Sequence, residues 1–135
     1  MPAFVFISHP GRDTWIARQI ASRVASAGAG QFLDAADVHT GDEFDDEILA
    51  GLEQCTELLA LLTPWAIKSR YVWMEIGAAW GNRKRVTAVL HGTTIDEFSA
   101  RTDIPMALKR KQLIELNNLE DYFKQLADRI ENETD

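Results

Sequence analysis

Short runs of consecutive apolar residues alternate along this 135-residue chain with stretches in which apolar residues recur every three or four positions. The uninterrupted runs hold many branched and aromatic residues, a pattern typical of strands that are buried on both faces of a parallel sheet. They predict five strands, at residues 3–7, 31–34, 57–63, 86–90 and 112–116. Strand and helix patterns alternate five times, which predicts a parallel sheet with helices on both faces.

The periodic stretches predict helices whose apolar side chains pack on the sheet. These side chains are Ile16, Ile20 and Val24; Phe44, Ile48, Leu52 and Cys55; Val72, Ile76, Ala79 and Trp80; and Leu119, Tyr122, Phe123, Leu126 and Ile130. We expect Asp13 to cap the first of these helices and residues 40–43 (Thr, two residues, Glu) to form a capping box for the second. The sequence also predicts a short helix within residues 94–108, broken before Pro105, and a frayed acidic tail at residues 131–135.

Five strand–helix units in a chain of this length favour an α/β flavodoxin-like three-layer fold, a five-stranded parallel sheet with the strand order 2-1-3-4-5 flanked by helices. The length suits one domain, at residues 1–135. In such sheets ligands bind beyond the carboxyl ends of the strands, where the order reverses between the first and third strands. The candidate site is therefore formed by the loops that follow Ile7, Asp34 and Thr63.

The composition narrows the class of protein. Apolar residues make up 46% and charged residues 26%, which is ordinary for a globular domain. The longest apolar run, residues 58–62, is too short to cross a bilayer, and no basic-then-apolar leader opens the chain, so we expect a cytoplasmic protein without a membrane partner. The single Cys55 excludes an internal disulfide and fits a reducing compartment. A net charge of −7 argues against a nucleic-acid partner.

Charge is unevenly distributed along the chain. Residues 34–57 hold nine acids and no Lys or Arg, whereas residues 68–85 hold five bases and one acid, Glu75. Such segments, placed on different surfaces of the fold, favour head-to-tail self-association that can propagate as a filament. The alternative is that both segments are ordinary solvated helix faces.

The turn after the first strand has two interpretations. Residues 8–12 either form a plain turn closed by Asp13, or their backbone amides cradle a phosphate. The glycine pattern of a P-loop or of a dinucleotide fingerprint is missing here. A receiver domain is also excluded, because the first and third strands end in Ser8, His9 and Thr63 rather than in acids.

The histidines do not indicate a metal site. His9, His39 and His91 lie on separate predicted loops without the spacing of metal ligands. Ser8 and His9 are sequence neighbours and would point to opposite sides of a strand, which argues against a catalytic triad. We expect no metal ion in this protein.

Glu75 is the acid that stands out. It lies in a predicted helix among Tyr71, Trp73, Met74 and Trp80. A lone glutamate on a helix is usually solvated, but aromatic neighbours this close favour a carboxylate at the wall of an apolar pocket. Burial of that kind raises the pKa of a carboxylate and suits it to site chemistry.

Four segments, in the expected order, resemble the Toll/interleukin-1 receptor (TIR) domain family. The opening motif is Phe6-Ile7-Ser8-His9 followed by Asp13, and the second strand with its BB loop is Phe32-Leu33-Asp34 followed by Gly41. The Ser-x-Trp-x-x-x-Glu segment of the family corresponds to Ser69 to Glu75. Glu75 to Ala79, followed by Arg85 to Leu90, has the form common in bacterial members. The resemblance runs from about Phe4 to Leu90 and implies the flavodoxin-like fold for the whole chain.

The resemblance also implies cleavage of NAD+ at the nicotinamide–ribose bond, an activity of many members, with Glu75 in the position of the catalytic glutamate. Tyr71 stands where the family usually has Trp, and His9 where it often has Tyr or His. NAD+ is then the substrate, and no cofactor is implied. The residues expected near the bound nucleotide are Ser8, His9, Asp34, Gly41, Tyr71 and Trp73.

One carboxylate suffices for this reaction. Glycosidases generally need a second carboxyl group as an acid, because their leaving group must be protonated. Nicotinamide leaves a pyridinium as a neutral molecule, so the remaining task is to stabilise positive charge on the ribose, which an anionic Glu75 can do. Attack by water gives ADP-ribose, and attack by an atom of the same nucleotide gives a cyclic isomer; the sequence leaves this choice open.

Three hypotheses follow for the function. The first is an NAD+ glycohydrolase or cyclase in bacterial antiphage defence or signalling, which self-associates as TIR enzymes do and answers to a separate sensor or effector chain. The second is a non-catalytic TIR module that binds other proteins. The third is a flavodoxin-like nucleotide-binding domain of another type. The presence of Glu75 favours the first.

Overall fold

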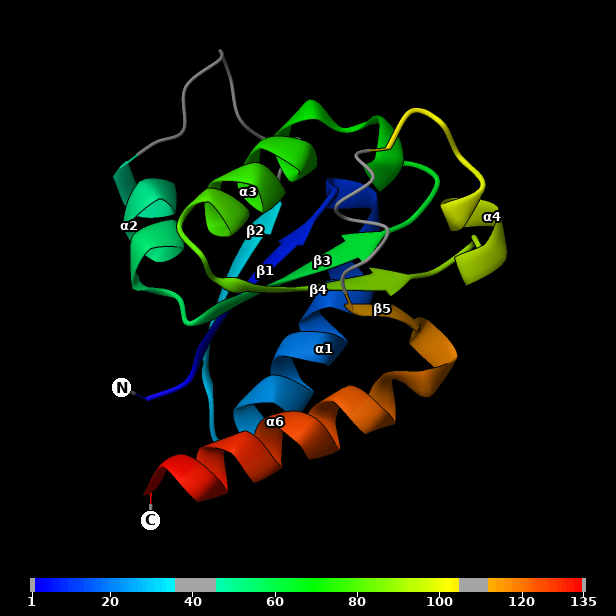
Figure 1. Cartoon of the computed structure of the whole chain (residues 1–135). Helices are drawn as coiled ribbons and strands as arrows, with labels where there is room; N and C mark the ends of the chain where they lie inside the picture. The colour runs from blue at the N-terminus through cyan, green and yellow to red at the C-terminus, as the bar shows by residue number, and fades with distance from the viewer. Residues whose placement is uncertain (1, 36–45, 105–111, 135) are drawn as a thin grey trace.

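A five-stranded parallel sheet with helices on both faces is the centre of the fold in the computed structural model, which describes residues 2–35, 46–104 and 112–134 (Figure 1). The strands are β1 (Phe4–His9), β2 (Gly30–Ala35), β3 (Glu57–Leu62), β4 (Arg85–Leu90) and β5 (Gln112–Glu115). The helices are α1 (Thr14–Ser26), α2 (Asp46–Gln54), α3 (Arg70–Gly81), α4 (Ile95–Ser99) and α6 (Leu119–Thr134). The strands pair in the order β2-β1-β3-β4-β5, which confirms the predicted fold and strand order.

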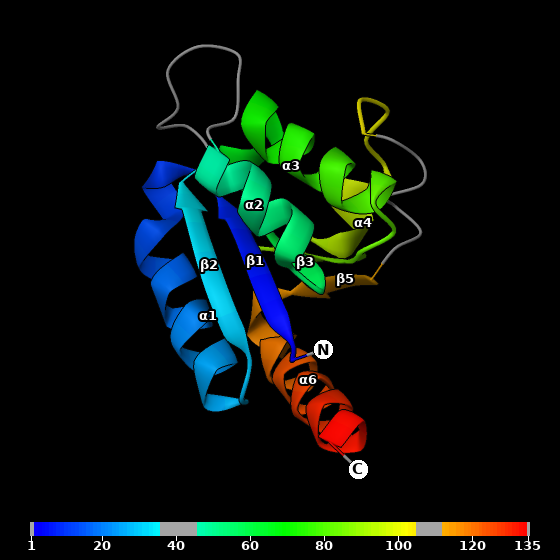
Figure 2. The same ribbon diagram turned by 90° about the vertical axis from the view of Figure 1, so that its left-hand side faces the viewer.

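The helices form two layers, one on each face of the sheet. Helices α2, α3 and α4 cover one face, and α1 and α6 cover the other, as the two perpendicular views show (Figures 1 and 2). Alternate residues of β1 serve the two layers: Phe6 belongs to the core under α2 and α3, whereas Val5 and Ile7 belong to the core under α1 and α6. Because side chains alternate along a strand, Ser8 shares the α3 side with Phe6.

Helix α3 carries one predicted core residue that the structure leaves exposed. Val72, Ile76 and Ala79 are buried as expected, but Trp80 is 42% exposed. At about 100° per residue, Trp80 lies roughly 80° around the helix axis from Val72, beyond the stripe that the sheet covers. The residue on the other flank of the stripe is Glu75, which is fully buried.

The caps of two helices, α1 and α4, differ from expectation. Asp13 stands at the N-cap position of α1, but its side chain makes no capping hydrogen bond there. The predicted box at residues 40–43 lies outside the described residues, whereas Thr94 and Glu97 form a reciprocal capping box on α4 that the sequence analysis missed.

The carboxyl-terminal helix is longer than predicted. Helix α6 continues to Thr134, where the sequence analysis expected a frayed tail from residue 131. No Gly or Pro interrupts this segment, so the preceding turns can propagate through it. No helix in the described part of the chain is long and apolar enough to cross a membrane.

A buried ionic cluster lies at the amino end of the sheet, where β3 begins. Glu57 is 5% exposed and accepts hydrogen bonds from the Tyr122 hydroxyl and, at 2.6 Å, from Nη2 of Arg129 on α6. Arg85, at the start of β4, approaches the same carboxylate at 4.0 Å. Burial, and then the negative charge of Glu57, raise the pKa of Tyr122 well above its usual range. We call Glu57, Tyr122, Arg129 and Arg85 the Glu57 cluster.

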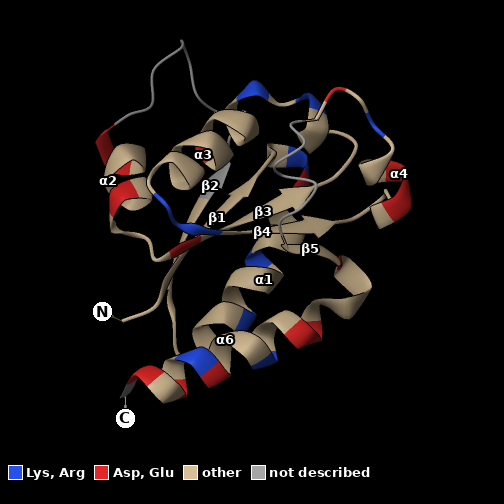
Figure 3. Cartoon of the chain, in the orientation of Figure 1, with Lys and Arg blue, Asp and Glu red and all other residues tan. Residues whose placement is uncertain are grey.

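The acidic and basic segments are closer together than predicted. Acidic side chains lie on α2, and bases lie near both ends of α3 (Figure 3). At the far end of α3, Lys84 donates to the Glu53 carbonyl oxygen at 3.0 Å, and Arg85 faces Glu57. The expectation of two separate surfaces is therefore wrong for this end, because the turn after α3 runs beside the end of α2.

Candidate functional site

The sheet brings the predicted strand ends together at its carboxyl edge. Ser8 of β1 pairs in register with Asp34 of β2 and with Ala60 of β3. β1 lies between β2 and β3, so the strand order reverses beside Ser8. This is the position where doubly wound sheets bind ligands. Ser8 and His9 still belong to the strand, and the connection to α1 begins at Pro10.

A direct contact joins Ser8 to Glu75. The Ser8 hydroxyl donates to Oε1 of Glu75 at 2.5 Å, and both side chains are fully buried. Helix α3 supplies this geometry because its core stripe, through Val72 and Ile76, turns the neighbouring Glu75 towards the end of β1. The arrangement holds a carboxylate in a dry place, where its field is little screened. In this conformation the Glu75 side chain has no surface open to a ligand.

A second hydroxyl–carboxylate contact lies at the same carboxyl edge of the sheet. The Thr63 hydroxyl, just after β3, donates to Oδ2 of Asp13 at 2.7 Å and also accepts from the Ala66 amide at 3.2 Å. Asp13 is 5% exposed, so this is its main polar contact rather than a cap of α1. The contact connects the turn after β1 to the turn after β3.

His9 lies on the opposite side of β1 from Ser8, as the alternation of side chains predicts. It is 2% exposed, and its Nδ1 lies 2.9 Å from the carbonyl oxygen of Pro10. A carbonyl oxygen only accepts, so Nδ1 is the donor in this contact. Ser8 and Glu75 are thus brought together, and His9 is adjacent along the strand but faces away.

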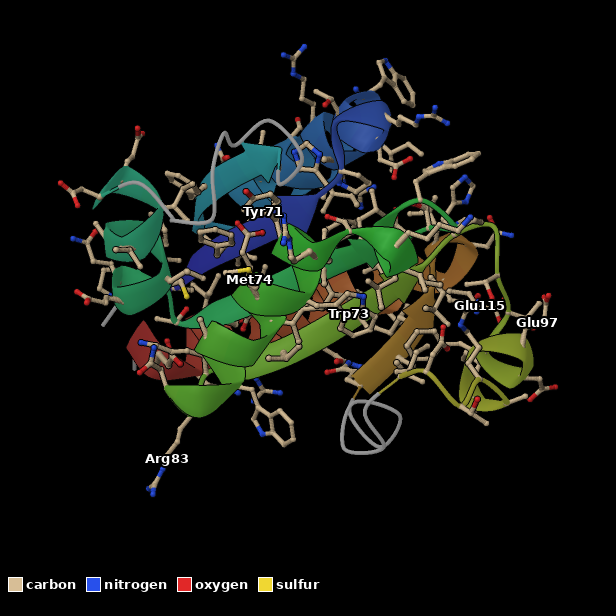
Figure 4. The ribbon with its side chains drawn as sticks, turned by 90° about the horizontal axis from the view of Figure 1, so that it is seen from above. Tyr71, Trp73, Met74, Arg83, Glu97 and Glu115 are labelled. Carbon is tan, nitrogen blue, oxygen red and sulfur yellow. The ribbon has the colours of Figure 1, made fainter. Side chains whose placement is uncertain are left out.

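Tyr71 and Trp73 lie on different sides of α3 (Figure 4). Tyr71 is one turn before Glu75 and shares its side of the helix, whereas Trp73 lies roughly 160° around the axis from Glu75. The Trp73 indole donates to the Ile67 carbonyl oxygen at 2.8 Å and packs against the core. The structure therefore places Tyr71 near Glu75 and Trp73 away from it.

Of the two other residues predicted to contact the nucleotide, Asp34 and Gly41, the structure describes only Asp34. The backbone of Asp34 lies beside Ser8 through strand pairing. Gly41 lies outside the described residues. The roles assigned to both remain predictions.

A cavity of about 440 Å³ opens at this edge, beside the first turn of α3. Its lining residues are Pro10, Arg12, Trp65, Lys68, Ser69, Arg70 and Tyr71. Of these residues, Tyr71 was predicted to contact the nucleotide, and Pro10 and Arg12 belong to the turn that was one candidate for a backbone phosphate cradle. Arg12 and Trp65 follow the ends of β1 and β3, so a search of the two predicted site loops for cations and aromatics could have found them.

The described part of the chain contains no cluster of side chains that could bind a metal ion. Across residues 2–35, 46–104 and 112–134, no three His, Cys, Asp or Glu side chains are grouped so that they could hold a metal ion. The polar groups of the candidate site are instead the carboxylates of Glu75 and Asp13, each with a hydroxyl donor.

Comparison of the sequence with known families and proteins gives two matches. The model of the TIR domain family matches residues 5–130. A plant protein from Brachypodium distachyon, described as a probable 2' cyclic ADP-D-ribose synthase (BdTIR), is 32% identical over 89 residues. The match covers 64% of this chain and 40% of that protein, so the chain matches less than half of the relative's length.

Solved structures agree on the fold. The TIR domain of the Toll-related receptor TRR-2 from Hydra magnipapillata superposes with a TM-score of 0.63 at 16% identity, over 93% of this chain and 94% of that one. The TIR domains of the activated Roq1 resistosome give a TM-score of 0.66 at 11% identity, over 98% and 99%. At these identities the likeness concerns the arrangement of strands and helices.

Proposed function

We propose a reaction for this chain, which belongs to the TIR domain family. The reaction is cleavage of NAD+ at the nicotinamide–ribose bond, with Glu75 as the catalytic carboxylate. The observation that carries this proposal is the buried Ser8–Glu75 contact at the point where the strand order reverses. The description of the Brachypodium relative as a cyclic ADP-ribose synthase supports the same reaction class.

The proposed role of Glu75 is electrostatic. Nicotinamide leaves as a neutral molecule, so positive charge develops on the ribose while the bond breaks. A carboxylate fixed in a dry pocket stabilises that charge more than water does. Ser8 holds one oxygen of Glu75 and so sets the direction of the carboxylate. The bond breaks without a cofactor, and the product is ADP-ribose or a cyclic isomer according to whether water or the nucleotide attacks.

The burial of Glu75 implies a conformational step before reaction. The side chain exposes no surface in the isolated chain. We propose that self-association, of the kind that places TIR domains in the Roq1 resistosome, opens or completes the site. Control by assembly, or by a separate sensor chain, fits the proposed role in bacterial antiphage defence or signalling, which rests on the resemblance of residues 75–90 to bacterial members.

Incubation of the purified protein with NAD+ over a wide range of protein concentration tests the reaction. Mass spectrometry is expected to show free nicotinamide together with ADP-ribose or a cyclic isomer. Glu75→Gln is expected to abolish the signal, whereas Glu133→Gln, at an exposed position of α6, leaves it unchanged. Full activity of Glu75→Gln contradicts the proposal, and silence at every concentration favours a non-catalytic interaction module.

Scattering and electron microscopy test the proposed assembly. We expect concentration-dependent growth of particles with NAD+ that weakens at high salt, because opposite charges then attract less. Unchanged monomers at high concentration contradict it.

A further inference from the structure

Three cations line the cavity beside the first turn of α3. Arg12 comes from the turn after β1, Lys68 ends the short 3-10 helix just before α3, and Arg70 is the first residue of α3. The amino end of a helix adds positive potential through its aligned peptide dipoles. In a protein with a net charge of −7, this is a local concentration of positive charge.

In the described part of the chain, no carboxylate lines this cavity. Asp13 turns inward to the Thr63 hydroxyl, and Glu75 accepts the Ser8 hydroxyl below the surface. Both are at least 95% buried. Within residues 2–35, 46–104 and 112–134, neither Arg12 nor Lys68 forms an ion pair. An anion that enters the cavity therefore meets Arg12 and Lys68 without an ion pair to a described carboxylate.

Arg12 is also held in place. Its guanidinium carbon lies 4.9 Å from the centre of the Trp65 ring, a cation–π contact between the turns that follow β1 and β3. A guanidinium presents a planar fork of donors that matches phosphate oxygens, and an ordered one loses less freedom on binding. Lys68 supplies a more flexible point charge on the same cavity.

We propose that this cavity binds the diphosphate of the dinucleotide, through Arg12, Lys68 and Arg70, and so makes the protein select dinucleotides over nucleosides without phosphate. The inference rests on the proposed NAD+ cleavage for its substrate. The spacing supports it: Tyr71 lines the cavity and lies four residues, about 6 Å of helix rise, before Glu75. If the ribose of the dinucleotide lies at Glu75, the diphosphate attached to that ribose reaches the cavity.

The first test removes the cations without touching Ser8 or Glu75. Arg12→Gln, Lys68→Gln and the double variant are compared with a matched control, Arg18→Gln with Lys124→Gln, which removes two exposed charges from α1 and α6 on the other face. Circular dichroism and thermal unfolding establish that each variant is folded. Calorimetry then measures binding of ADP, with AMP and adenosine as probes that carry fewer phosphates.

The wild type and the control pair are expected to bind ADP more tightly than AMP, and adenosine weakest. Each substitution is expected to weaken ADP binding about tenfold, the scale of one charge-assisted hydrogen bond, and to leave adenosine binding within a factor of two. Arg12→Lys, which keeps the charge but not the fork, is expected to recover part of the loss. Equal affinity of the double variant and the wild type for ADP overturns the proposal.

Kinetics separate this inference from the proposed reaction. For NAD+, the double variant is expected to raise KM at least tenfold, with a kcat that stays within a factor of about three, because the cations contact the diphosphate and not the breaking bond. Cleavage of NAD+ with an unchanged KM in the double variant defeats the diphosphate site and leaves the reaction intact. Cation-dependent ADP binding by a protein that never cleaves NAD+ defeats the reaction and supports the site.

Discussion

Two buried glutamates lie at opposite ends of the sheet and have different surroundings. Glu57, at the start of β3, is held by the Tyr122 phenol and by Arg129, with Arg85 close by. Glu75, at the carboxyl edge, accepts the neutral hydroxyl of Ser8 and lies below a basic cavity. Both carboxylates are almost wholly removed from solvent.

The comparison sets a glutamate that holds the fold together beside the glutamate that we propose for catalysis. The Glu57 cluster joins β3, β4 and α6, so its charges hold three elements together. Glu75 contacts a hydroxyl on the strand at which the order reverses, where ligands bind in this class of fold. Burial alone therefore does not distinguish the two acids, and the position of Glu75 on the sheet is what supports the proposal of a catalytic role.

The largest effect is expected from Glu75→Gln. Loss of the negative charge is expected to lower the rate of NAD+ cleavage by about 10²–10³, because one preorganised electrostatic contact to the transition state is removed. The free energy of unfolding, measured in urea, is expected to stay within about 1 kcal/mol, since the amide oxygen still accepts from Ser8. A rate within threefold of the wild type contradicts the comparison.

Glu57→Gln is expected to show the opposite result. It leaves the charge of Arg129 without its carboxylate, so the free energy of unfolding in urea falls by about 2 kcal/mol, less than for a fully buried pair because Arg129 is 25% exposed. Activity per folded molecule is expected to be unchanged. Glu53→Gln, at an exposed position of α2, is the matched control, and equal stability of the two variants counts against a framing role.

Ser8→Ala tests the contact rather than the carboxylate. The hydroxyl is a positioning group, and its loss is expected to reduce kcat about tenfold, in line with one buried hydrogen bond. KM for NAD+ is expected to change less than kcat. Ser22→Ala, on the exposed face of α1, provides the control, and an unchanged kcat means that Glu75 is oriented by other contacts.

Tyr122→Phe is expected to change how stability depends on pH. Burial and Glu57 raise the pKa of Tyr122 in the folded state, so above about pH 10 the unfolded chain loses the proton first. The wild type therefore keeps its full stability below that pH and loses up to about 1.4 kcal/mol per pH unit above it, relative to the variant. Urea unfolding at pH 9 to 11 measures the difference. Both proteins carry Cys55→Ala, because burial also raises the pKa of that thiol.

The smallest effect is expected from a change in the backbone conformation just after α3, which alters stability but not the proposed reaction. Arg83, which points away from the fold at the end of this helix (Figure 4), has a φ of 60°, a left-handed conformation that favours glycine. Arg83→Gly is expected to raise the free energy of unfolding by about 0.5 kcal/mol without changing NAD+ cleavage. Arg83→Ala keeps the strain and is expected to give no such gain; equal behaviour of the two variants refutes this explanation.

The sheet was predictable because five short apolar runs, each followed by a helical pattern, leave few alternatives for a chain of this length. The aromatic neighbours of Glu75 correctly predicted that it is buried, whereas its catalytic role rests on the resemblance of its segment to TIR domains and stays a prediction. Trp80 was misplaced because a residue on the margin of an apolar stripe is buried or exposed according to how far its neighbours extend, which depends on tertiary packing.

Long-range polar contacts were not predictable from local pattern. Asp13 and Thr63 are 50 residues apart, and the rule for helix caps assigned Asp13 to the backbone beside it. Glu57 was counted among nine acids of one segment, although its partners Tyr122 and Arg129 lie 65 and 72 residues away. The cationic cavity is formed by two turns and a helix start, and no single segment of sequence contains it.

The contact between Asp13 and Thr63 has a thermodynamic consequence for ligands at this edge. Loops that must order on binding reduce affinity, by about 0.5–1.5 kcal/mol for each side chain that becomes immobile. Here the turns after β1 and β3 are already joined in the folded protein, with the Ala66 amide bound to the same hydroxyl. The conformational entropy of these two turns is therefore lost during folding, and a ligand that binds between them does not have to lose it again.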